Sequence, residues 1–382
     1  MDLKVLHSIS PFSFQLIQFM QSSYLCLCSG LLAFVLALVP AAAEDLRMNQ
    51  IQVMGTHNSY HMAPPPPLLQ LIRLGSPSGA DALDYTHRPI EDQLSRLNVR
   101  QLELDIFADP KGSLFARPIG YLSIVQSGGD AGQDPNANGV LERPGMKVLH
   151  SPGYDYRSTV PSLTAALRLV RDWSQKNPDH VPILLLIELK QTAVGPIEEK
   201  LVPFDAEQLD AVDAEIRSIF TDKELITPDS VRGHRETLRE AVLLDGWPRL
   251  SDARGKVLFA LDNGGELRDQ YMAGHPSLRE RVMFVSVGMD HPAAAFLKLN
   301  DPVGQFDQIQ EAVRRGFIVR TRADAETREA RTHSAARRDA SLTSGAQYIS
   351  TDYPEPDTRW SDYHVQVDDG KEYRVNPVSA PK

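Results

Sequence analysis

Two histidines stand directly after short apolar runs, where enzymes built on parallel strands keep their reactive groups. His57 follows the run that ends at Met54, within the segment Gly55–His61, and His150 closes the run Lys147–His150. Histidine takes up and releases protons near neutral pH, so the two residues are candidates for a general acid and a general base. A single histidine at a strand end is more often a hydrogen-bonded structural residue, so the neighbouring residue types must decide.

Three carboxylates also fall at the ends of apolar runs. Glu103 and Asp105 are two positions apart in QLELDIF, and Glu188 ends PILLLIE. The two-residue period of a strand places Glu103 and Asp105 on one face. Carboxylates that converge in a partly desolvated place raise one another's pKa or need a cation to remain ionised. Together with the amide oxygen of Asn58 they form an all-oxygen set, which favours Ca²⁺ over Zn²⁺ and over Mg²⁺.

Three basic residues accompany these carboxylates. Lys190 lies two positions after Glu188, and Arg320 and Arg322 repeat that spacing on a later apolar run. Their charge and position predict binding of an anionic substrate group such as a phosphate, for which guanidinium offers forked donors. The alternative is structural: the arginines would pair with carboxylates such as Glu188 or Asp352, and Lys190 would be a solvated strand end.

The elements that must position these residues are short strands that alternate with helices. Eight runs rich in β-branched and aliphatic residues are expected as strands: Gln50–Met54, Val99–Phe107, Lys147–His150, Ile183–Lys190, Lys256–Leu261, Val282–Val287, Phe317–Arg322 and Tyr348–Asp352. Amphipathic patterns predict helices at Pro161–Asn177, Asp205–Phe220 and Gln305–Arg315. This alternation predicts an α/β fold, a TIM-type (β/α)8 barrel, regular or distorted, in a single domain. Its active site would lie at the carboxyl ends of the strands, where the polar residues gather.

The ordered motifs resemble a known family. GTHNSY, ELDIF, VLHSPGYDYRST and PILLLIELK, followed by IVRTRAD and SGAQYISTDY, are similar to the calcium-dependent phosphoinositide-specific phospholipases C, above all their secreted bacterial and fungal branch. The likeness runs from Asn49 to about Tyr353. It implies cleavage of phosphatidylinositol-type phospholipids to diacylglycerol and an inositol (cyclic) phosphate.

The resemblance also implies roles for individual residues. His57 would be the general base on the inositol 2-hydroxyl, and His150 the general acid that protonates the diacylglycerol oxygen. The Ca²⁺ cofactor would be held by a set of four residues: Asn58, Glu103, Asp105 and Glu188.

Two other functions stay open. Glycerophosphodiester phosphodiesterases share the barrel and a metal site with two histidines, but typically carry His-Arg-Gly where this chain has His57-Asn58-Ser59. A non-catalytic calcium- or lipid-binding barrel is the other alternative. The intact histidine pair and the full set of oxygen ligands argue against it.

The composition limits the partners. The 382 residues include 40 basic and 50 acidic side chains, a formal net charge of −10. A chain with this negative net charge is not expected to have a basic surface for binding nucleic acid, or a broad basic face for binding anionic lipid. The resemblance implies a phospholipid substrate at a membrane surface, and the charge restricts that contact to a local, peripheral one; no protein partner is predicted.

The first 43 residues are expected to be a signal peptide. An apolar stretch from Tyr24 to Val39 leads to Pro40 and three alanines that end at Ala43, the pattern of a cleavage site. An uncleaved membrane anchor is the alternative. The chain is thus expected to be secreted or periplasmic, with residues 44–382 as the catalytic domain.

The segment Ala63–Leu74 interrupts the regular pattern with a proline run and an apolar stretch. The favoured interpretation is that Leu68, Leu71 and Ile72 pack on the barrel, and the alternative is a lid or a membrane-touching element.

The segment Asp134–Gly139 matches the opening of an EF-hand loop. Gly145 replaces the bidentate glutamate expected at the twelfth position. It is therefore predicted to be a loop shaped by Asp and Asn side chains, and a second ion site is the less favoured interpretation.

Overall fold

The computed structural model describes residues 46–193 and 195–380. The expected signal peptide, residues 1–43, lies outside them. From Leu46 onward the chain forms one compact unit. Within the described ranges, none of the helices combines the length and apolar character needed to span a bilayer.

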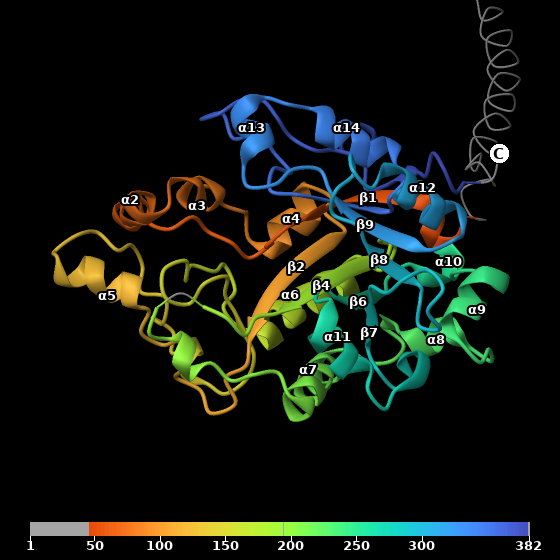
Figure 1. The fold of residues 1–382 in the computed structure, drawn as a ribbon, viewed down its shortest axis with the longest axis horizontal. Coiled ribbons are helices and arrows are strands. Elements are labelled where there is room, and N and C mark those ends of the chain that lie inside the picture. Colours follow the sequence, from red (N-terminus) through yellow and green to blue (C-terminus); the bar gives the residue numbers. More distant parts are fainter. Residues whose placement is uncertain (1–45, 194, 381–382) are drawn as a thin grey trace, which may run out of the picture. The chain divides into compact units, whose positions relative to one another are not determined.

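A ring of parallel strands forms the centre of this unit (Figure 1). In the described part of the chain its eight members are β1 (Ile51–Thr56), β2 (Gln101–Phe107), β4 (Ile183–Leu189), β6 (Val257–Leu261), β7 (Met283–Val285), β8 (Phe296–Lys298), β9 (Ile318–Arg322) and β10 (Tyr348–Thr351). Pairing follows this order and returns from β10 to β1. Two adjacent pairs of strands in the ring are joined by a single residue pair each. β1 pairs with β2 at Gly55 and Gln101, and β7 is joined to β8 by a bridge between Ser286 and Phe296. The predicted TIM-type barrel is confirmed in a distorted form.

Three two-residue strands lie outside the ring. They are β3 (Lys147–Val148), antiparallel to β2, β5 (Leu225–Ile226), parallel to the start of β6, and β11 (Arg374–Val375), antiparallel to β1. The prediction that Lys147–His150 forms the third barrel strand is therefore wrong. Only two of its residues pair, because a turn between Ser151 and Asp155 begins immediately after His150. The barrel strand that was not predicted is β8, whose three residues are too few to show a strand period.

Helices cover the outside of the ring and extend its loops. They are α2 (Pro66–Gly75), α3 (Pro77–Ala82), α4 (Ile90–Arg96), α5 (Ile119–Gln126), α6 (Leu163–Lys176), α7 (Ala206–Ile219), α8 (Pro228–Arg232), α9 (Leu238–Leu244), α10 (Leu250–Ala253), α11 (Gly265–Met272), α12 (Phe306–Arg314), α13 (Arg328–Thr332) and α14 (Ala336–Thr343). Short 3-10 helices occur at Met48–Gln50, Val140–Glu142, Glu198–Lys200, Pro276–Leu278 and Asp368–Gly370. The three predicted helices correspond to α6, α7 and α12, with ends that differ by one or two residues. Asp205 fixes the start of α7, since its side chain accepts a hydrogen bond from the Gln208 backbone N–H.

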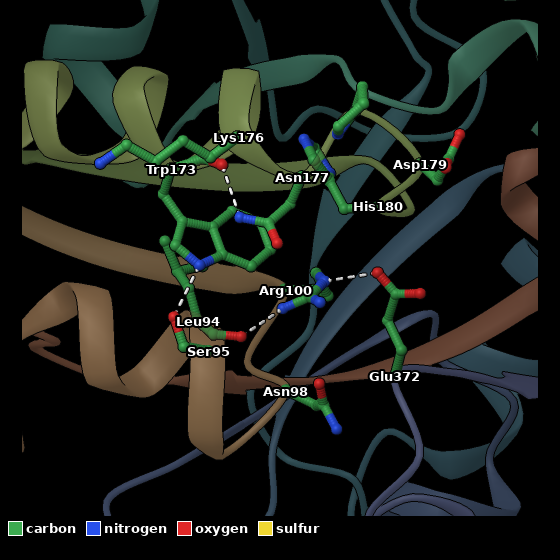
Figure 2. A pocket seen from close by; sticks show the side chains of 11 residues that line it. Leu94, Ser95, Asn98, Arg100, Trp173, Lys176, Asn177, Asp179, His180 and Glu372 are labelled. Atoms are coloured by element: carbon green, nitrogen blue, oxygen red, sulfur yellow. Dashed lines mark hydrogen bonds and ion pairs between the residues drawn. The ribbon is translucent and has the colours of Figure 1, made fainter.

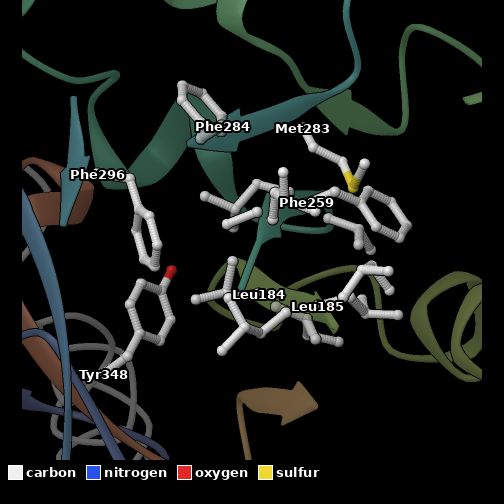
Figure 3. Packing of buried hydrophobic residues seen from close by; sticks show 14 of the residues in the cluster. Leu184, Leu185, Phe259, Met283, Phe284, Phe296 and Tyr348 are labelled. Carbon is white, nitrogen blue, oxygen red and sulfur yellow. The ribbon is translucent and has the colours of Figure 1, made fainter. Parts of the chain in front are cut away.

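The core explains why the apolar runs form these strands. In β4 both faces are buried, so its sequence is a continuous apolar run rather than an alternating one. Figure 3 shows Leu184 and Leu185 of this strand in the core with aromatic and methionine side chains of other barrel strands, and the labelled residues are Phe259, Met283, Phe284, Phe296 and Tyr348. The same strand becomes polar only at its carboxyl end, which is where Glu188 lies.

Candidate active site

Three carboxylates meet at the carboxyl ends of β2 and β4. Glu103, Asp105 and Glu188 each offer an oxygen, and these oxygens lie within 4.8 Å of one another. The register of the sheet causes this convergence, because Asp105 stands opposite Glu188 across the parallel pair. Glu103 lies two residues earlier, on the same face of β2. The convergence predicted from the two-residue spacing is thus present.

Unsatisfied oxygens at this place fit a hard cation. Both carboxylate oxygens of Asp105 and the Oδ1 atom of Asn58 are buried and accept no hydrogen bond, although Lys190 forms an ion pair with Asp105 Oδ2. Asn58 has a positive φ of 45°. The next residue, Ser59, donates its backbone N–H to the Glu103 carbonyl at 2.9 Å. The loop after β1 therefore lies against β2 at Glu103. Buried polar atoms without partners are costly. Together with the carboxylates of Glu103 and Glu188, these oxygens form a set that suits Ca²⁺.

The protonation of the carboxylates supports the same conclusion. Burial raises the pKa of Asp105 above its ordinary value, and the charge of Glu188 raises it further. Burial also raises the pKa of Glu103, although the positive charge of Arg320 opposes this shift. A divalent cation among these groups would favour their ionised forms.

Lys190 lies at the edge of this cluster. Its Nζ atom is 3.3 Å from Asp105 Oδ2 and 3.2 Å from Glu188 Oε1, and its side chain remains partly exposed. These ion pairs raise its pKa although burial alone would lower it. Lys190 is therefore a charged group that both holds the carboxylates and faces the opening of the site.

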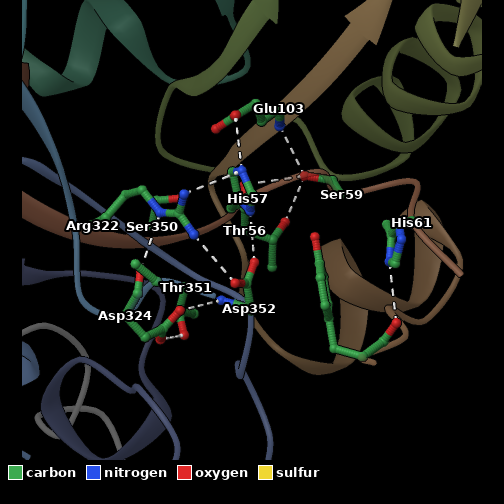
Figure 4. A network of polar contacts seen from close by, with 12 residues as sticks. Thr56, His57, Ser59, His61, Glu103, Arg322, Asp324, Ser350, Thr351 and Asp352 are labelled. Carbon is green, nitrogen blue, oxygen red and sulfur yellow. Dashed lines mark hydrogen bonds and ion pairs between the residues drawn. The ribbon is translucent and has the colours of Figure 1, made fainter. Parts of the chain in front are cut away.

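His57 is oriented by an aspartate from the last barrel strand. Its Nδ1 atom lies 2.7 Å from Oδ1 of Asp352, and its Nε2 atom is 3.3 Å from Nη1 of Arg322 and 3.7 Å from Oε1 of Glu103 (Figure 4). Burial lowers the pKa of His57 to about 3, and Arg322 contributes to this shift. Arg322 also donates from Nη2 to the second oxygen of Asp352, at 3.2 Å. The His57 ring is thus held neutral, with Nε2 directed towards the carboxylate cluster.

Arg320 occupies a different place from the one expected for a substrate-binding residue. Its side chain is only 1% exposed and forms an ion pair with Glu103. It also donates to Ser350 Oγ at 3.0 Å and to Asn300 Oδ1 at 2.6 Å. A guanidinium enclosed in this way fixes the position of Glu103 and leaves no exposed face for a phosphate. The expectation of direct substrate binding therefore passes to Arg322 and Lys190.

His150 lies on the loop that follows β3 and is held by an aspartate of its own. Its Nδ1 atom is 2.7 Å from Oδ2 of Asp155, which is buried. Burial alone would lower the pKa of His150, but the hydrogen bond and the charge of Asp155 raise it above its ordinary value. The two histidines are therefore shifted in opposite directions, which is a feature of acid–base pairs.

Sequence reasoning missed Asp155, and it considered Asp352 only as a possible partner of the arginines. A signal for each was present. Asp352 ends the last predicted strand, which in a closed barrel must neighbour the first strand and hence His57. Asp155 follows His150 by five residues in HSPGYD, a glycine-containing segment that predicts a turn.

The helix in the segment Ala63–Leu74 packs only in part. Leu68 is fully buried, but it contacts α5 rather than the barrel wall. Leu71 is 51% exposed and Leu74 is 86% exposed. The expectation that Leu68, Leu71 and Ile72 pack on the barrel is therefore wrong, because α2 stands beside α5 beyond the strand ends (Figure 1). Leu68 and Ile72 pack in the cluster that contains Ile124 of α5, and Leu71 faces solvent.

The loop Asp134–Gly139 uses its own side chains for local hydrogen bonds. Asp134 Oδ1 accepts from the backbone N–H of Asn136, and Asn136 Oδ1 accepts from that of Leu141. These contacts fit the predicted loop shaped by Asp and Asn residues.

A cavity of about 510 Å³ lies at the opposite end of the barrel (Figure 2). Arg100 and His180 line it, and they precede β2 and β4. Several of its polar groups are paired with one another, with Arg100 Nε donating to Glu372 at 2.8 Å and Trp173 Nε1 donating to Ser95 at 2.7 Å. Reactive groups of such barrels gather at the carboxyl ends of the strands, so this cavity is not the catalytic site.

Comparisons with known proteins identify a family and a fold. Residues 46–377 match the family model described as phosphoinositide phospholipase C, Ca²⁺-dependent. A search of curated proteins gives no match.

Among solved structures, the chain is similar to the calcium-dependent phosphoinositol-specific phospholipase C of a Gram-negative bacterium, Pseudomonas sp. The second crystal form of its apo form shares 18% identity at a TM-score of 0.53, over 88% of this chain and 98% of that chain. Its myoinositol complex shares 19% identity at a TM-score of 0.54, over 87% and 96% of the two chains. At identities this low, the structural similarity shows a common fold and nothing more specific.

Proposed function

The chain belongs to the calcium-dependent phosphoinositide phospholipase C family, and we propose that it cleaves phosphatidylinositol-type phospholipids into diacylglycerol and an inositol cyclic phosphate. The resemblance drawn from the motifs is confirmed at the level of the family. The observation that carries the proposal is the three-carboxylate cluster, of which one member, Glu103, lies 3.7 Å from Nε2 of the neutral His57.

The metal would be held by the cluster and its neighbouring loop, through four residues: Asn58, Glu103, Asp105 and Glu188. When bound, Ca²⁺ supplies positive charge that neutralises a phosphate and lowers the pKa of a coordinated hydroxyl. Arg320 keeps Glu103 in place for this role through their buried ion pair.

His57 is suited to be the general base. Because Nδ1 donates to the carboxylate of Asp352, the lone pair is on Nε2, which lies 3.3 Å from Arg322 Nη1 and 3.7 Å from Glu103 Oε1. His57 would take the proton of the inositol 2-hydroxyl as its oxygen attacks phosphorus. Asp352 would then stabilise the imidazolium that forms, as the carboxylate does in other histidine–aspartate pairs.

His150 is suited to be the general acid. Its raised pKa favours the protonated ring, which would give a proton to the glycerol oxygen as the bond from that oxygen to phosphorus breaks. The phosphorus keeps its bond to the inositol 1-oxygen, so the products are a cyclic phosphate and diacylglycerol. Lys190, beside Asp105, and Arg322, beside His57, are partly exposed and would bind the phosphate oxygens.

A vesicle assay tests this function. Phosphatidylinositol vesicles should release a water-soluble inositol phosphate in the presence of calcium, and release should stop in excess chelator. Phosphatidylcholine vesicles serve as the control for the head group. Activity on soluble glycerophosphodiesters, with none on the vesicles, would instead support the glycerophosphodiesterase alternative.

We propose that α2 and α5 provide the contact with the membrane. Both helices follow the carboxyl ends of barrel strands, and they pack together through Leu68 and Ile124. Apolar side chains on them remain exposed: Leu71, Leu74, Ile119 and Val125. An exposed apolar patch beside a lipid-cleaving site is well placed to enter the edge of a bilayer. The signal-peptide pattern of residues 1–43 supports export of the chain, which would let it meet membranes outside the cytoplasm.

Removing two of these leucines should weaken action on membranes. A fully buried leucine contributes about 1.5–3 kcal/mol, so partial insertion of Leu71 and Leu74 predicts at least a tenfold loss of vesicle binding for the double change to Gln. Vesicle sedimentation measures the binding. Hydrolysis of a soluble short-chain substrate should not change.

Leu244→Gln provides a matched control, because Leu244 is 64% exposed on α9, on the other side of the view in Figure 1. An equal loss of binding in this control would show that the α2–α5 patch is not the contact surface.

A further inference from the structure

A buried histidine, His61, lies behind His150, the candidate general acid. His61 Nε2 is 2.9 Å from Oδ2 and 3.1 Å from Oδ1 of Asp155, the same carboxylate that holds His150 Nδ1 at 2.7 Å. The side chains of His61 and Asp155 are excluded from solvent. One carboxylate thus joins two imidazole rings, whose centroids are 6.0 Å apart at an interplanar angle of 90°.

His61 is fixed on its other side as well. Its Nδ1 atom lies 3.1 Å from the backbone oxygen of Tyr85, and its ring stacks on the Tyr85 ring with centroids 4.4 Å apart (Figure 4). The Tyr85 carbonyl and the Asp155 carboxylate can only accept, so both ring nitrogens of His61 donate. Nothing in this arrangement lets the His61 ring turn without losing both its hydrogen bonds and its stacking contact.

The geometry of Asp155 depends on this ring. The loop from Ser151 to Asp155 positions the backbone, with hydrogen bonds of 3.1 Å and 2.9 Å between these two residues. The carboxylate itself could still rotate about its terminal bond. His61 contacts both oxygens, which leaves Oδ2 directed at His150.

We propose that His61 is a positioning residue for the proton donor: it locks the Asp155 carboxylate, and this carboxylate holds the His150 ring with Nε2 facing the leaving oxygen. The inference rests on the proposed function, since it assigns a partner to the general acid. His61 touches neither substrate nor metal in this role, and it acts only through Asp155. A misplacement of a reacting group by about 1 Å can cost on the order of 10²-fold in rate.

His61→Phe tests the proposal, because phenylalanine keeps the stacking on Tyr85 and removes both hydrogen bonds. We expect kcat on phosphatidylinositol to fall about 10- to 100-fold. KM and the calcium dependence should stay as in the wild type. A substrate with a nitrophenol leaving group needs no proton donor, and its turnover should remain nearly unchanged. His61→Gln keeps one donor towards Asp155 and should recover part of the lost rate.

His180→Phe is the matched control. His180 is also buried and also makes two hydrogen bonds, to Ser174 at 2.7 Å and to the Val181 carbonyl at 2.7 Å, but it lies at the other end of the barrel. Rates are compared per folded molecule, so a variant that folds poorly remains informative. Equal losses of His61→Phe on both substrates, or losses matched by His180→Phe, would overturn the positioning role. Failure of the wild-type chain on both substrates would overturn the proposed function instead.

Discussion

Replacing either His57 or His150 by alanine should lower the turnover of phosphatidylinositol by about 10²- to 10⁴-fold, the usual contribution of a positioned acid or base. The loss should appear in kcat, because neither ring supplies much of the binding surface. The two variants should then respond differently to the leaving group. A nitrophenol leaves without a proton, so it should restore much of the activity of His150→Ala. It should not restore His57→Ala, in which the attacking hydroxyl still lacks a base.

The structure gives a physical reason for this asymmetry. Arg322 and burial keep the pKa of His57 low, at about 3, whereas Asp155 raises that of His150 against the effect of burial. A neutral ring can accept a proton and a charged ring can give one. Equal rescue of both variants by the better leaving group would show that the roles are assigned wrongly. Unchanged calcium-dependent stabilisation in both variants is the control for intact folding.

The site could be predicted from the sequence where it depends on strand periodicity. Glu103, Asp105 and Glu188 end long apolar runs, and the two-residue period together with parallel pairing is enough to bring them together. The same reasoning misplaced His150, because Lys147 and Val148 form only a short antiparallel contact with β2. A four-residue apolar run carries no information about its direction in a sheet.

Contacts that close the barrel could not be predicted in this way. Arg320 pairs with Glu103 across 217 positions, and His57 pairs with Asp352 across 295. Such partners depend on which strands become neighbours when the ring closes and on the stagger between them. Charge and spacing alone do not distinguish Arg320 from Arg322 as the partner of a carboxylate. The burial of Arg320 decides between them, and burial is a property of the folded chain.

Asp105→Asn should weaken calcium binding, but it should not lower the stability of the calcium-free protein at neutral pH. The substitution keeps the shape of the side chain and removes one charge from the cluster. Weaker calcium binding should reduce activity strongly at limiting calcium. In the wild type, a calcium concentration of 100 times Kd should stabilise the fold by about 2.7 kcal/mol, and most of this gain should be lost in the variant.

Without calcium the same variant should be at least as stable as the wild type at neutral and higher pH. Burial and Glu188 raise the pKa of Asp105 in the folded chain. A raised carboxyl pKa favours folding at low pH, and this contribution is lost as the pH rises from the ordinary aspartate value of about 3.9 into the neutral range. Asparagine has no charge to bury and avoids that loss. Lys190 keeps Glu188 as a partner at 3.2 Å, so the change leaves no isolated cation.

Thermal melts at pH 5 and pH 8, each with calcium and with chelator, measure both effects. Asp109→Asn is the matched control, because Asp109 is another buried acid just beyond β2 and pairs with Lys147 at 3.2 Å. Asp109→Asn leaves the charge of the buried Lys147 without a carboxylate partner, so this substitution should lower the melting temperature with and without calcium alike. If calcium raised the melting temperature of Asp105→Asn as much as that of the wild type, Asp105 would not be a ligand, and its unsatisfied oxygens would need another explanation.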